Sequence, residues 1–317
     1  MGIYKGSSLD LTTPFKHVVK SRLDPPIYYM KTILVIITVT FCCHYCFADQ
    51  AIVAAKVPEA PVVDGVGNDA VWRGAGPIIT HDKVADIDVA LKAVYTDREI
   101  FFLVEYPDVD ESREHKSWVW DKEMEVYRIG PAREDSFVLK WSMEPGPVDL
   151  SVYSDDNYKA DIWFWKASRT DPSGFADDKM HIYGESEQKH SADMTSRLGY
   201  SKYLSRPADK GRAAFEDLVY IEYEGDVMPH FKKGQPTGSR ADVRAKGQWA
   251  GGKWTIEFAR LLDTENEDDI IFDIEKEYLF GISKFEIAGR GEDPKSDMPL
   301  YGTGDVSERL ILQFDKK

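Results

Sequence analysis

Alternating apolar and polar positions are clear in the chain from residue 87 onward, and a period of two is typical of β-strands. Every second residue from Ile87 to Tyr95 is apolar, which places these side chains on one face of an extended chain. Residues 96–99 read Thr-Asp-Arg-Glu and supply turn chemistry, and a second apolar run follows from Ile100 to Tyr106. This pattern predicts a β-hairpin.

Strand-like runs of the same kind recur through the rest of the chain. Gly251 and Gly252, between Trp249 and Trp254, favour a tight turn because glycine tolerates the positive φ angles of primed turns. Long amphipathic helical patterns are missing from the sequence. We therefore predict an all-β fold, an antiparallel two-sheet β-sandwich with long inserted loops, built as a single domain by residues 49–317. The further strands are expected at residues 136–143, 148–153, 218–223, 241–249, 253–259, 278–287 and 309–314.

Two segments between the predicted strands exceed the usual length of a loop. Residues 107–133 are charged and carry Trp118 and Trp120, whereas residues 155–207 hold two tryptophans and then a stretch rich in Ser, Asp and Lys. We expect the second segment to be irregular rather than part of a sheet. Long ordered loops on a rigid sandwich are usually where binding occurs.

The first 48 residues differ from the remainder and resemble an export signal. Met30-Lys31 precede a mostly apolar run from Ile33 to Cys43, and small residues flank Phe47 before Asp49. This pattern predicts a signal peptide at residues 30–48, cleaved near Ala48, behind a non-structural extension at residues 1–29. The protein is then periplasmic or otherwise secreted. The run is shorter than the roughly 20 residues of a membrane helix, so no membrane span is expected after cleavage; a retained N-terminal anchor is the alternative.

Charge and cysteine content exclude several classes of function. Lys plus Arg total 40 against 55 Asp plus Glu, a net charge of −15, and without a basic stripe this argues against nucleic-acid binding. All three cysteines, at positions 42, 43 and 46, lie in the predicted leader. The mature chain therefore has no disulfide, no thiolate metal site and no C-x-x-C-H attachment site for c-type haem.

No catalytic motif is present, so we do not expect an enzyme. The sequence lacks G-x-S-x-G, H-E-x-x-H and Walker-type glycine loops, and the five histidines of the mature chain are scattered, as surface or structural histidines are. Acidic clusters at Asp155-Asp156, Asp177-Asp178 and residues 265–269 offer oxygen ligands for calcium, but none has the spacing of a recognised calcium loop. We interpret all three as solvated acidic faces.

Two stretches resemble known families. The segment Pro61-Val-Val-Asp-Gly65, followed by Asn68-Asp69 and Val71-Trp72, resembles the opening of family 9 carbohydrate-binding modules, in which Trp72 would plug the core. The longer stretch resembles the haem-binding domain of the ethylbenzene dehydrogenase gamma subunit and of related cytochromes that serve periplasmic molybdenum enzymes of the dimethyl sulfoxide reductase type. It consists of Ala160-Asp-Ile-Trp-Phe-Trp-Lys-Ala167, Arg169, Asp171-Pro172, Gly174 and Ala176-Asp177-Asp178.

The second resemblance implies a non-covalent b-type haem ligated by a methionine and a lysine. Met143 is the methionine candidate because it ends a run whose alternation places it with Phe137, Leu139 and Trp141; ordinary core filling is an equal alternative. For the lysine, the position of Lys295 fits the resemblance slightly better than that of Lys284, and either can also be a solvated lysine. Trp163 and Trp165 would contact the haem, and Phe164 stands where many relatives have histidine, so any contact there is apolar.

Two hypotheses of function follow. The first is an exported haem b electron-transfer domain, the gamma-like subunit of a periplasmic molybdenum oxidoreductase or a free-standing relative. Its expected partners are molybdenum and iron–sulfur subunits or soluble redox carriers. The alternative is a non-redox carbohydrate- or ligand-binding sandwich, in which the tryptophans at positions 118, 120, 163 and 165 stack on sugar faces.

Overall fold

The predicted hairpin is present and forms the centre of one sheet. In the computed structural model, which describes residues 50–289 and 302–316, β3 (Ile87–Tyr95) and β4 (Glu99–Pro107) pair antiparallel. Thr96 holds the turn: its backbone N–H donates to the Glu99 carbonyl at 2.9 Å, and its hydroxyl accepts from the Glu99 N–H at 3.1 Å. The Thr96 side chain therefore closes the turn that the sequence pattern predicted.

The described residues contain strands and three short 3₁₀ helices. The strands of the sandwich are β1 (Gln50–Lys56), β2 (Ile78–Asp82), β3, β4, β7 (Ser136–Ser142), β8 (Tyr158–Lys166), β9 (Asp177–Gly184), β10 (Ala192–Thr195), β11 (Ser201–Ser205), β15 (Arg244–Trp249), β16 (Lys253–Leu261), β17 (Tyr278–Ser283) and β18 (Leu310–Phe314). Outside it lie β5 (Trp118–Asp121), β6 (Val126–Ile129), β12 (Phe215–Asp217), β13 (Val227–Met228) and β14 (Phe231–Lys233). The 3₁₀ helices are η1 (Ala70–Arg73), η2 (Asp171–Ser173) and η3 (Gly238–Ala241).

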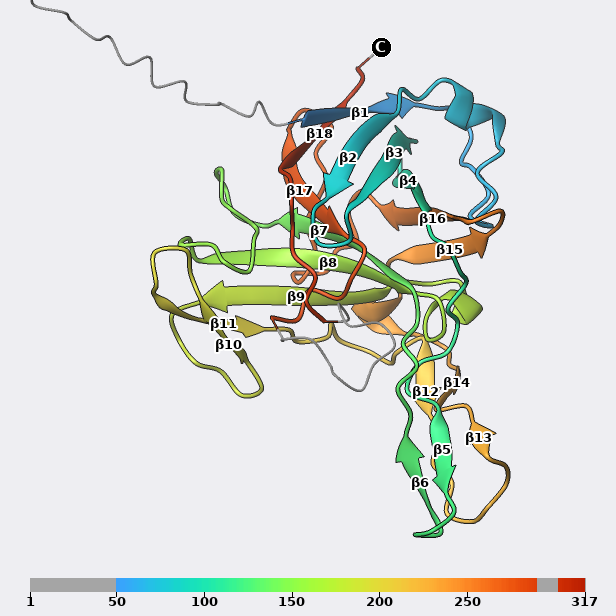
Figure 1. The fold of residues 1–317 in the computed structure, drawn as a ribbon. Coiled ribbons are helices and arrows are strands. Elements are labelled where there is room, and N and C mark those ends of the chain that lie inside the picture. Colours follow the sequence, from blue (N-terminus) through green and yellow to red (C-terminus); the bar gives the residue numbers. More distant parts are fainter. Residues whose placement is uncertain (1–49, 290–301, 317) are drawn as a thin grey trace, which may run out of the picture. The chain divides into compact units, whose positions relative to one another are not determined.

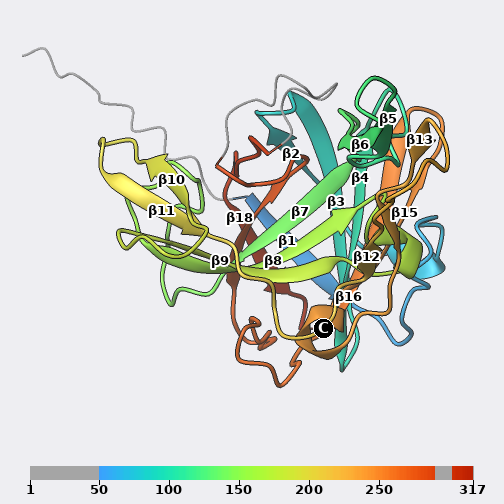
Figure 2. The same cartoon turned by 90° about the horizontal axis from the view of Figure 1, so that it is seen from below.

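Two sheets share strand β1, which confirms the predicted sandwich. Residues 50–54 of β1 pair with β18, and residues 55–56 pair with β3. The first sheet runs β10-β11-β9-β8-β7-β17-β18-β1 and the second β1-β3-β4-β16-β15, with β2 also on β3. Figure 1 shows both sheets, and in Figure 2 the β10–β11 hairpin lies at the edge of the first sheet far from the second. The pairing is antiparallel as predicted, except that β1 is parallel to both neighbours.

The main core fills the space between the sheets with aromatic side chains. Phe102 of β4 packs against Trp141 of β7 at a ring distance of 5.3 Å and against Trp163 of β8 at 6.1 Å. Trp165 meets Trp254 of the second sheet at 4.8 Å. Tilted and edge-on arrangements of this kind are the favoured geometries for aromatic pairs, so the tryptophans hold the layers together.

The outer face of the first sheet is also buried. Ala160, Ile162 and Phe164 of β8 point away from the main core and belong to a second apolar cluster. The cover includes residues 148–152, where Val148, Leu150 and Val152 are buried in alternation. The predicted strand at 148–153 is therefore wrong: the segment alternates because it packs as a covering loop, with no strand partner.

The sequence prediction fails most clearly between residues 155 and 207. This segment was expected to be irregular, yet it contributes β8, β9, β10 and β11. The predicted strand at 218–223 is also absent, since these residues run beside the arm described next. The two errors have different causes. A strand covered on both faces shows no alternation of apolar and polar residues, whereas an exposed loop can show such alternation by chance.

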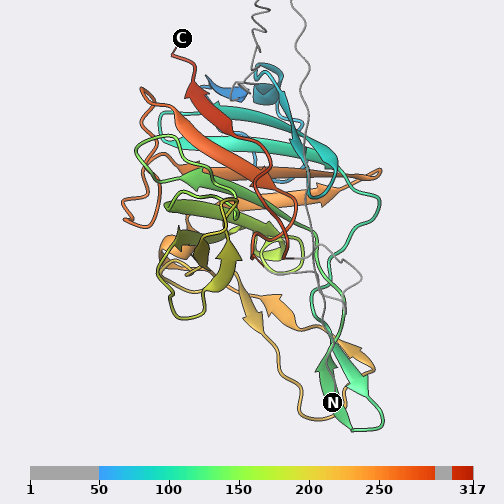
Figure 3. The same cartoon turned by 60° about the vertical axis from the view of Figure 1, so that its left-hand side comes forward.

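An arm leaves one end of the sandwich. Strands β5, β6 and β13 form a three-stranded sheet, and β12 pairs with β14 to form a two-stranded one. Figures 1 and 3 show these strands extending beyond the two main layers. The predicted long loop at 107–133 is thus partly sheet, and it carries Trp118 and Trp120.

The segment that resembles the start of a carbohydrate-binding module is anchored by Glu257 of β16. Trp72 is 2% exposed, and its indole N–H donates to the Glu257 carboxylate at 2.8 Å. The other carboxylate oxygen accepts from the backbone of Asp64 and Gly65 at 3.1 and 2.8 Å. Gly65 has φ +82°, and a Cβ there would lie 2.8 Å from the Gly247 carbonyl carbon, so only glycine fits. The predicted core role of Trp72 is confirmed.

The predicted extension and signal peptide lie outside the described residues. Within residues 50–289 and 302–316, no helix is both long and apolar enough to traverse a bilayer.

A buried lysine lies on the covered outer face of the first sheet. The Lys140 ammonium donates to the Leu150 carbonyl and to the Tyr158 hydroxyl, both at 2.8 Å. Burial penalises the charged form and lowers the pKa of Lys140 to about 7. Between about pH 7 and pH 10.5, Lys140 is therefore mostly protonated in the unfolded chain and mostly neutral in the folded chain.

We expect Lys140→Met to stabilise the protein at neutral pH. At pH 7 the gain should be about 2–4 kcal/mol, falling to about 1 kcal/mol near pH 9.5, because the folded-state penalty of Lys140 shrinks as pH rises through that window. Urea denaturation at both pH values measures the difference. The exposed Lys159 on the neighbouring strand is the control, and Lys159→Met should show neither effect. A gain for Lys140→Met that does not change with pH would contradict the assignment.

Candidate functional site

Met143 lies one residue beyond the end of β7. Its backbone N–H donates to the Lys159 carbonyl at 3.0 Å, and its side chain is partly exposed. Phe137, Leu139 and Trp141 belong to the main core as the alternation predicted, but Met143 is not among its buried members. The expectation that Met143 shares their apolar space is wrong, because the strand ends before it.

Lys284 lies directly after β17 and is engaged by an acid. Its ammonium is 2.9 Å from a carboxylate oxygen of Asp108, with both side chains largely buried. Its backbone N–H donates to the Asp82 carboxylate at 2.7 Å. To bind a metal, the Lys284 nitrogen would have to leave this partner.

Met143 and Lys284 lie near opposite ends of β7. Ser283 pairs with Val138, so Lys284 lies beside Phe137 at one end of β7, whereas Met143 lies past the other end. At about 3.3 Å per residue, this separates the two backbones by roughly 20 Å. The two side chains would have to cover most of this separation to share one iron, so the register argues against pairing Met143 with Lys284. Lys295 lies outside the described residues.

Trp163 and Trp165 are core residues. Both are 0% exposed, and the Trp165 indole N–H donates to the Asp171 carboxylate at 3.0 Å. Neither ring offers a face to a sugar, so their predicted role in carbohydrate stacking is wrong. Trp118 and Trp120, both on β5, are partly exposed and remain accessible on the arm.

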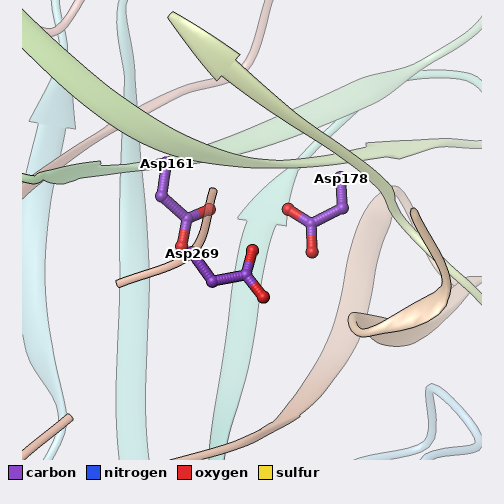
Figure 4. Close-up of side chains that lie close together, drawn as sticks. All are labelled: Asp161, Asp178 and Asp269. Carbon is purple, nitrogen blue, oxygen red and sulfur yellow. The ribbon is translucent and has the colours of Figure 1, made fainter. Parts of the chain in front are cut away.

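Three buried aspartates converge next to these tryptophans. Asp161 comes from β8, Asp178 from β9, and Asp269 from the segment between β16 and β17. One carboxylate oxygen from each lies within 4.8 Å of the others. Figure 4 shows the three carboxylates turned toward one another. We call Asp161, Asp178 and Asp269 the aspartate cluster.

Arg260 of β16 is the nearest positive charge to the cluster. Its guanidinium lies 2.5 Å from an Asp161 oxygen and 3.8 Å from an Asp269 oxygen, and it also donates to the Ile270 carbonyl. The Ile270 N–H donates to the same Asp161 oxygen at 3.1 Å. One oxygen of Asp161 is thus fully occupied, while the other has no hydrogen-bond partner among the described residues.

Asp178 has the least compensated position. It is 0% exposed, and neither of its carboxylate oxygens has a hydrogen-bond partner within residues 50–289 and 302–316. Burial and the nearby charges of Asp161, Asp269 and Asp209 raise its pKa well above the usual range. Burial also raises the pKa of Asp209 to about 8 and that of Asp269 to about 7.

The preceding residue shows the opposite environment. Asp177 points to the other face of β9, where Lys166 contacts it at 2.5 Å and Arg240 at 2.7 Å. Although burial opposes the effect, Lys166, Lys179 and Arg240 hold the pKa of Asp177 well below its usual range. Both residues are buried, so the interpretation of Asp177-Asp178 as a solvated acidic face is wrong.

A surface pocket adjoins the cluster on the side of Asp209. It has a volume of about 330 Å³ and is lined by Met180, residues 207–210, Glu267 and Asp268. Asp209 is 7% exposed and belongs both to the pocket wall and to the group of charges that act on Asp178. The cluster is therefore one residue away from solvent.

The sequence of β8 contains a signal for this cluster that the alternation of apolar residues does not reveal. Asp161 has the same parity as Trp163 and Trp165, so an acidic residue occupies a core position of β8. A buried strand with a charge on its core face requires a partner or a ligand. The acidic run at 265–269, interpreted as solvated, contributes Asp269 as the third buried carboxylate.

We expect Arg260→Met to destabilise the protein by about 3–5 kcal/mol, because it leaves the buried carboxylates without their counter-charge. Urea denaturation in buffer free of divalent cations measures the change. Arg98→Met, at the exposed β3–β4 turn, is the control and should stay near wild type. A loss below about 1 kcal/mol for Arg260→Met would show that the cluster is already neutral.

The chain matches a protein family and is similar to several solved structures. No curated protein sequence matches the chain. A family 9 carbohydrate-binding module from Caldicellulosiruptor kristjanssonii, solved with glucose, is 10% identical, with a TM-score of 0.39 over 84% of this chain and 97% of that one. A Bacteroides uniformis protein described as carbohydrate-binding is also 10% identical, with a TM-score of 0.37 over 84% and 99%. Residues 54–293 match the family described as ethylbenzene dehydrogenase, and the chain belongs to that family.

Proposed function

We propose that the chain is an exported, non-catalytic electron-transfer domain that holds a b-type haem, as the gamma-like subunit of a periplasmic molybdenum oxidoreductase or a free-standing relative. The observation that carries the proposal is the family match over residues 54–293, which spans both sheets. When bound, the haem would supply the one-electron chemistry, and the protein would supply burial and axial ligands.

Of the two ligand pairs, the proposal favours Met143 with Lys295. The strand register and the ion pair with Asp108 argue against Met143 with Lys284. Met143 with Lys295 stays a prediction. With all cysteines in the predicted leader, retention of the haem would depend on these ligands and on apolar burial.

Absorption spectroscopy of protein produced with haem tests the proposal. We expect a Soret band, and we expect Met143→Ala and Lys295→Ala each to shift the spectrum or release the haem, because losing one axial ligand loosens a non-covalent cofactor. Lys284→Ala is the matched control and should keep the wild-type spectrum. It should lower the stability of the fold, since it leaves the largely buried Asp108 without its ion-pair partner. Circular dichroism confirms that each variant remains folded.

Three results would count against the proposal or its ligands. A folded wild-type protein that never takes up haem overturns the electron-transfer function, and glycan binding at Trp118 and Trp120 becomes the function to test. An unchanged spectrum in both ligand variants overturns the ligand assignment alone. A shift caused by Lys284→Ala, with a folded protein, would contradict the position of Lys284 relative to Met143.

Export predicts a defined N-terminus. We expect protein recovered outside the cytoplasm to begin at or near Asp49, because the leader resembles a cleavable signal peptide. N-terminal sequencing of the exported protein measures this directly. Exported protein that retains residues 1–29 would contradict it.

A further inference from the structure

The strand register places the three aspartates together. Trp163 of β8 pairs with Asp178 of β9, and Asp161 pairs with Met180, so Asp161 and Asp178 are diagonal neighbours on one face of the sheet. Diagonal pairs are close enough for long or facing side chains to meet. Asp269 is held beside them because its neighbour Ile270 donates its backbone N–H to Asp161. Strand register therefore places Asp161 and Asp178, and the hydrogen bond from Ile270 places Asp269, which lies in the loop between β16 and β17.

The charges of this region do not balance. Asp161, Asp178, Asp269 and Asp209 are buried, and Arg260 is the one cation that contacts the cluster among the described residues. A buried carboxylate without a hydrogen-bond partner is costly. Asp178 has two such oxygens and points into the space between Asp161 and Asp269. Either shared protons or a bound cation must compensate for them.

We propose that the aspartate cluster binds a calcium ion, with Asp161, Asp178 and Asp269 as direct ligands. The donors are all carboxylate oxygens, the ligands that hard cations prefer, and no histidine or cysteine takes part. Their mutual spacing within 4.8 Å can be bridged by Ca²⁺, which binds oxygens at about 2.3–2.6 Å. Mg²⁺ suits the buried cluster less well because it retains several of its own waters.

The adjoining pocket provides a route for the ion. Asp209 separates the cluster from the pocket, and Glu267 and Asp268 line the same opening. A concave surface carrying acidic groups raises the local concentration of cations. Asp209 itself carries a buried carboxylate oxygen that has no hydrogen-bond partner among the described residues.

The test uses the purified full chain with either about 1 mM CaCl₂, in the range bound by extracellular modules, or excess EGTA. We expect one calcium per chain by elemental analysis after removal of free ion. For a Kd of about 0.1 mM, that concentration is about ten times the Kd, and Ca²⁺ should raise the melting temperature by about 3–6 °C over EGTA.

Asp178→Asn distinguishes a cation from shared protons. If Ca²⁺ occupies the cluster, the variant should lose most of the Ca²⁺-dependent shift and melt below wild type in Ca²⁺. In EGTA the order should reverse, because the substitution removes an unpaired buried charge. Asp177→Asn is the control on the opposite face of the same strand: it should be destabilised in both buffers and keep the Ca²⁺-dependent shift.

Two outcomes overturn the proposal. Wild-type protein that retains no calcium and melts at the same temperature in both buffers excludes the site, whether or not the variants fold. Asp178→Asn that melts above wild type in both buffers indicates shared protons between Asp178 and its neighbours. Neither outcome depends on haem uptake, so the result can be separated from the proposed function.

Discussion

Strand β8 is buried on both faces, and this burial determines how its polar side chains are paired. One face contributes Trp163 and Trp165 to the core between the sheets, and the other places Ile162 and Phe164 under the covering loops. Every polar group on such a strand must find its partner inside the protein, because no solvent reaches it. Lys166 finds Asp177 on the next strand, and Asp161 finds Arg260 on the opposite sheet.

The same constraint explains which parts of the fold the sequence could predict. β3 and β16 have alternating patterns or glycine turns beside them, and their predicted bounds agree with the structure to within two residues. β8 and β9 lie in a segment that was predicted to be irregular. Burial of both faces removes the period of two from β8, and ion pairs inside the protein let Asp177 and Lys179 occupy a strand that appears hydrophilic.

Site residues were harder to predict because a site depends on distances across the sheet. Met143 and Lys284 each satisfied a local criterion, the end of an apolar alternation and a lysine in an apolar run. The pairing of β17 with β7 places them at opposite ends of one strand, and only the register carries that information. The aspartate cluster is the opposite case, because the structure brings together three residues that satisfied no local criterion. Its members come from three segments, and none has a local motif.

Asp177 and Asp178 show how closely the fold controls charge. They are adjacent on β9 and both buried, yet Asp177 forms ion pairs with three cations and Asp178 forms none among the residues described. Since β9 alternates, the difference lies between the two faces: the outer face gathers Lys166 and Arg240, and the inner face gathers Asp161 and Asp269. A protein that needed only an inert core at this position could use asparagine or leucine in place of Asp178 at lower cost. The retained carboxylate is therefore better explained by a ligand than by packing. Because Asp178 lies on β9, and its neighbours Asp161 and Asp269 lie on β8 and on the segment between β16 and β17, that ligand would link strands of the first sheet to a segment that leaves the second.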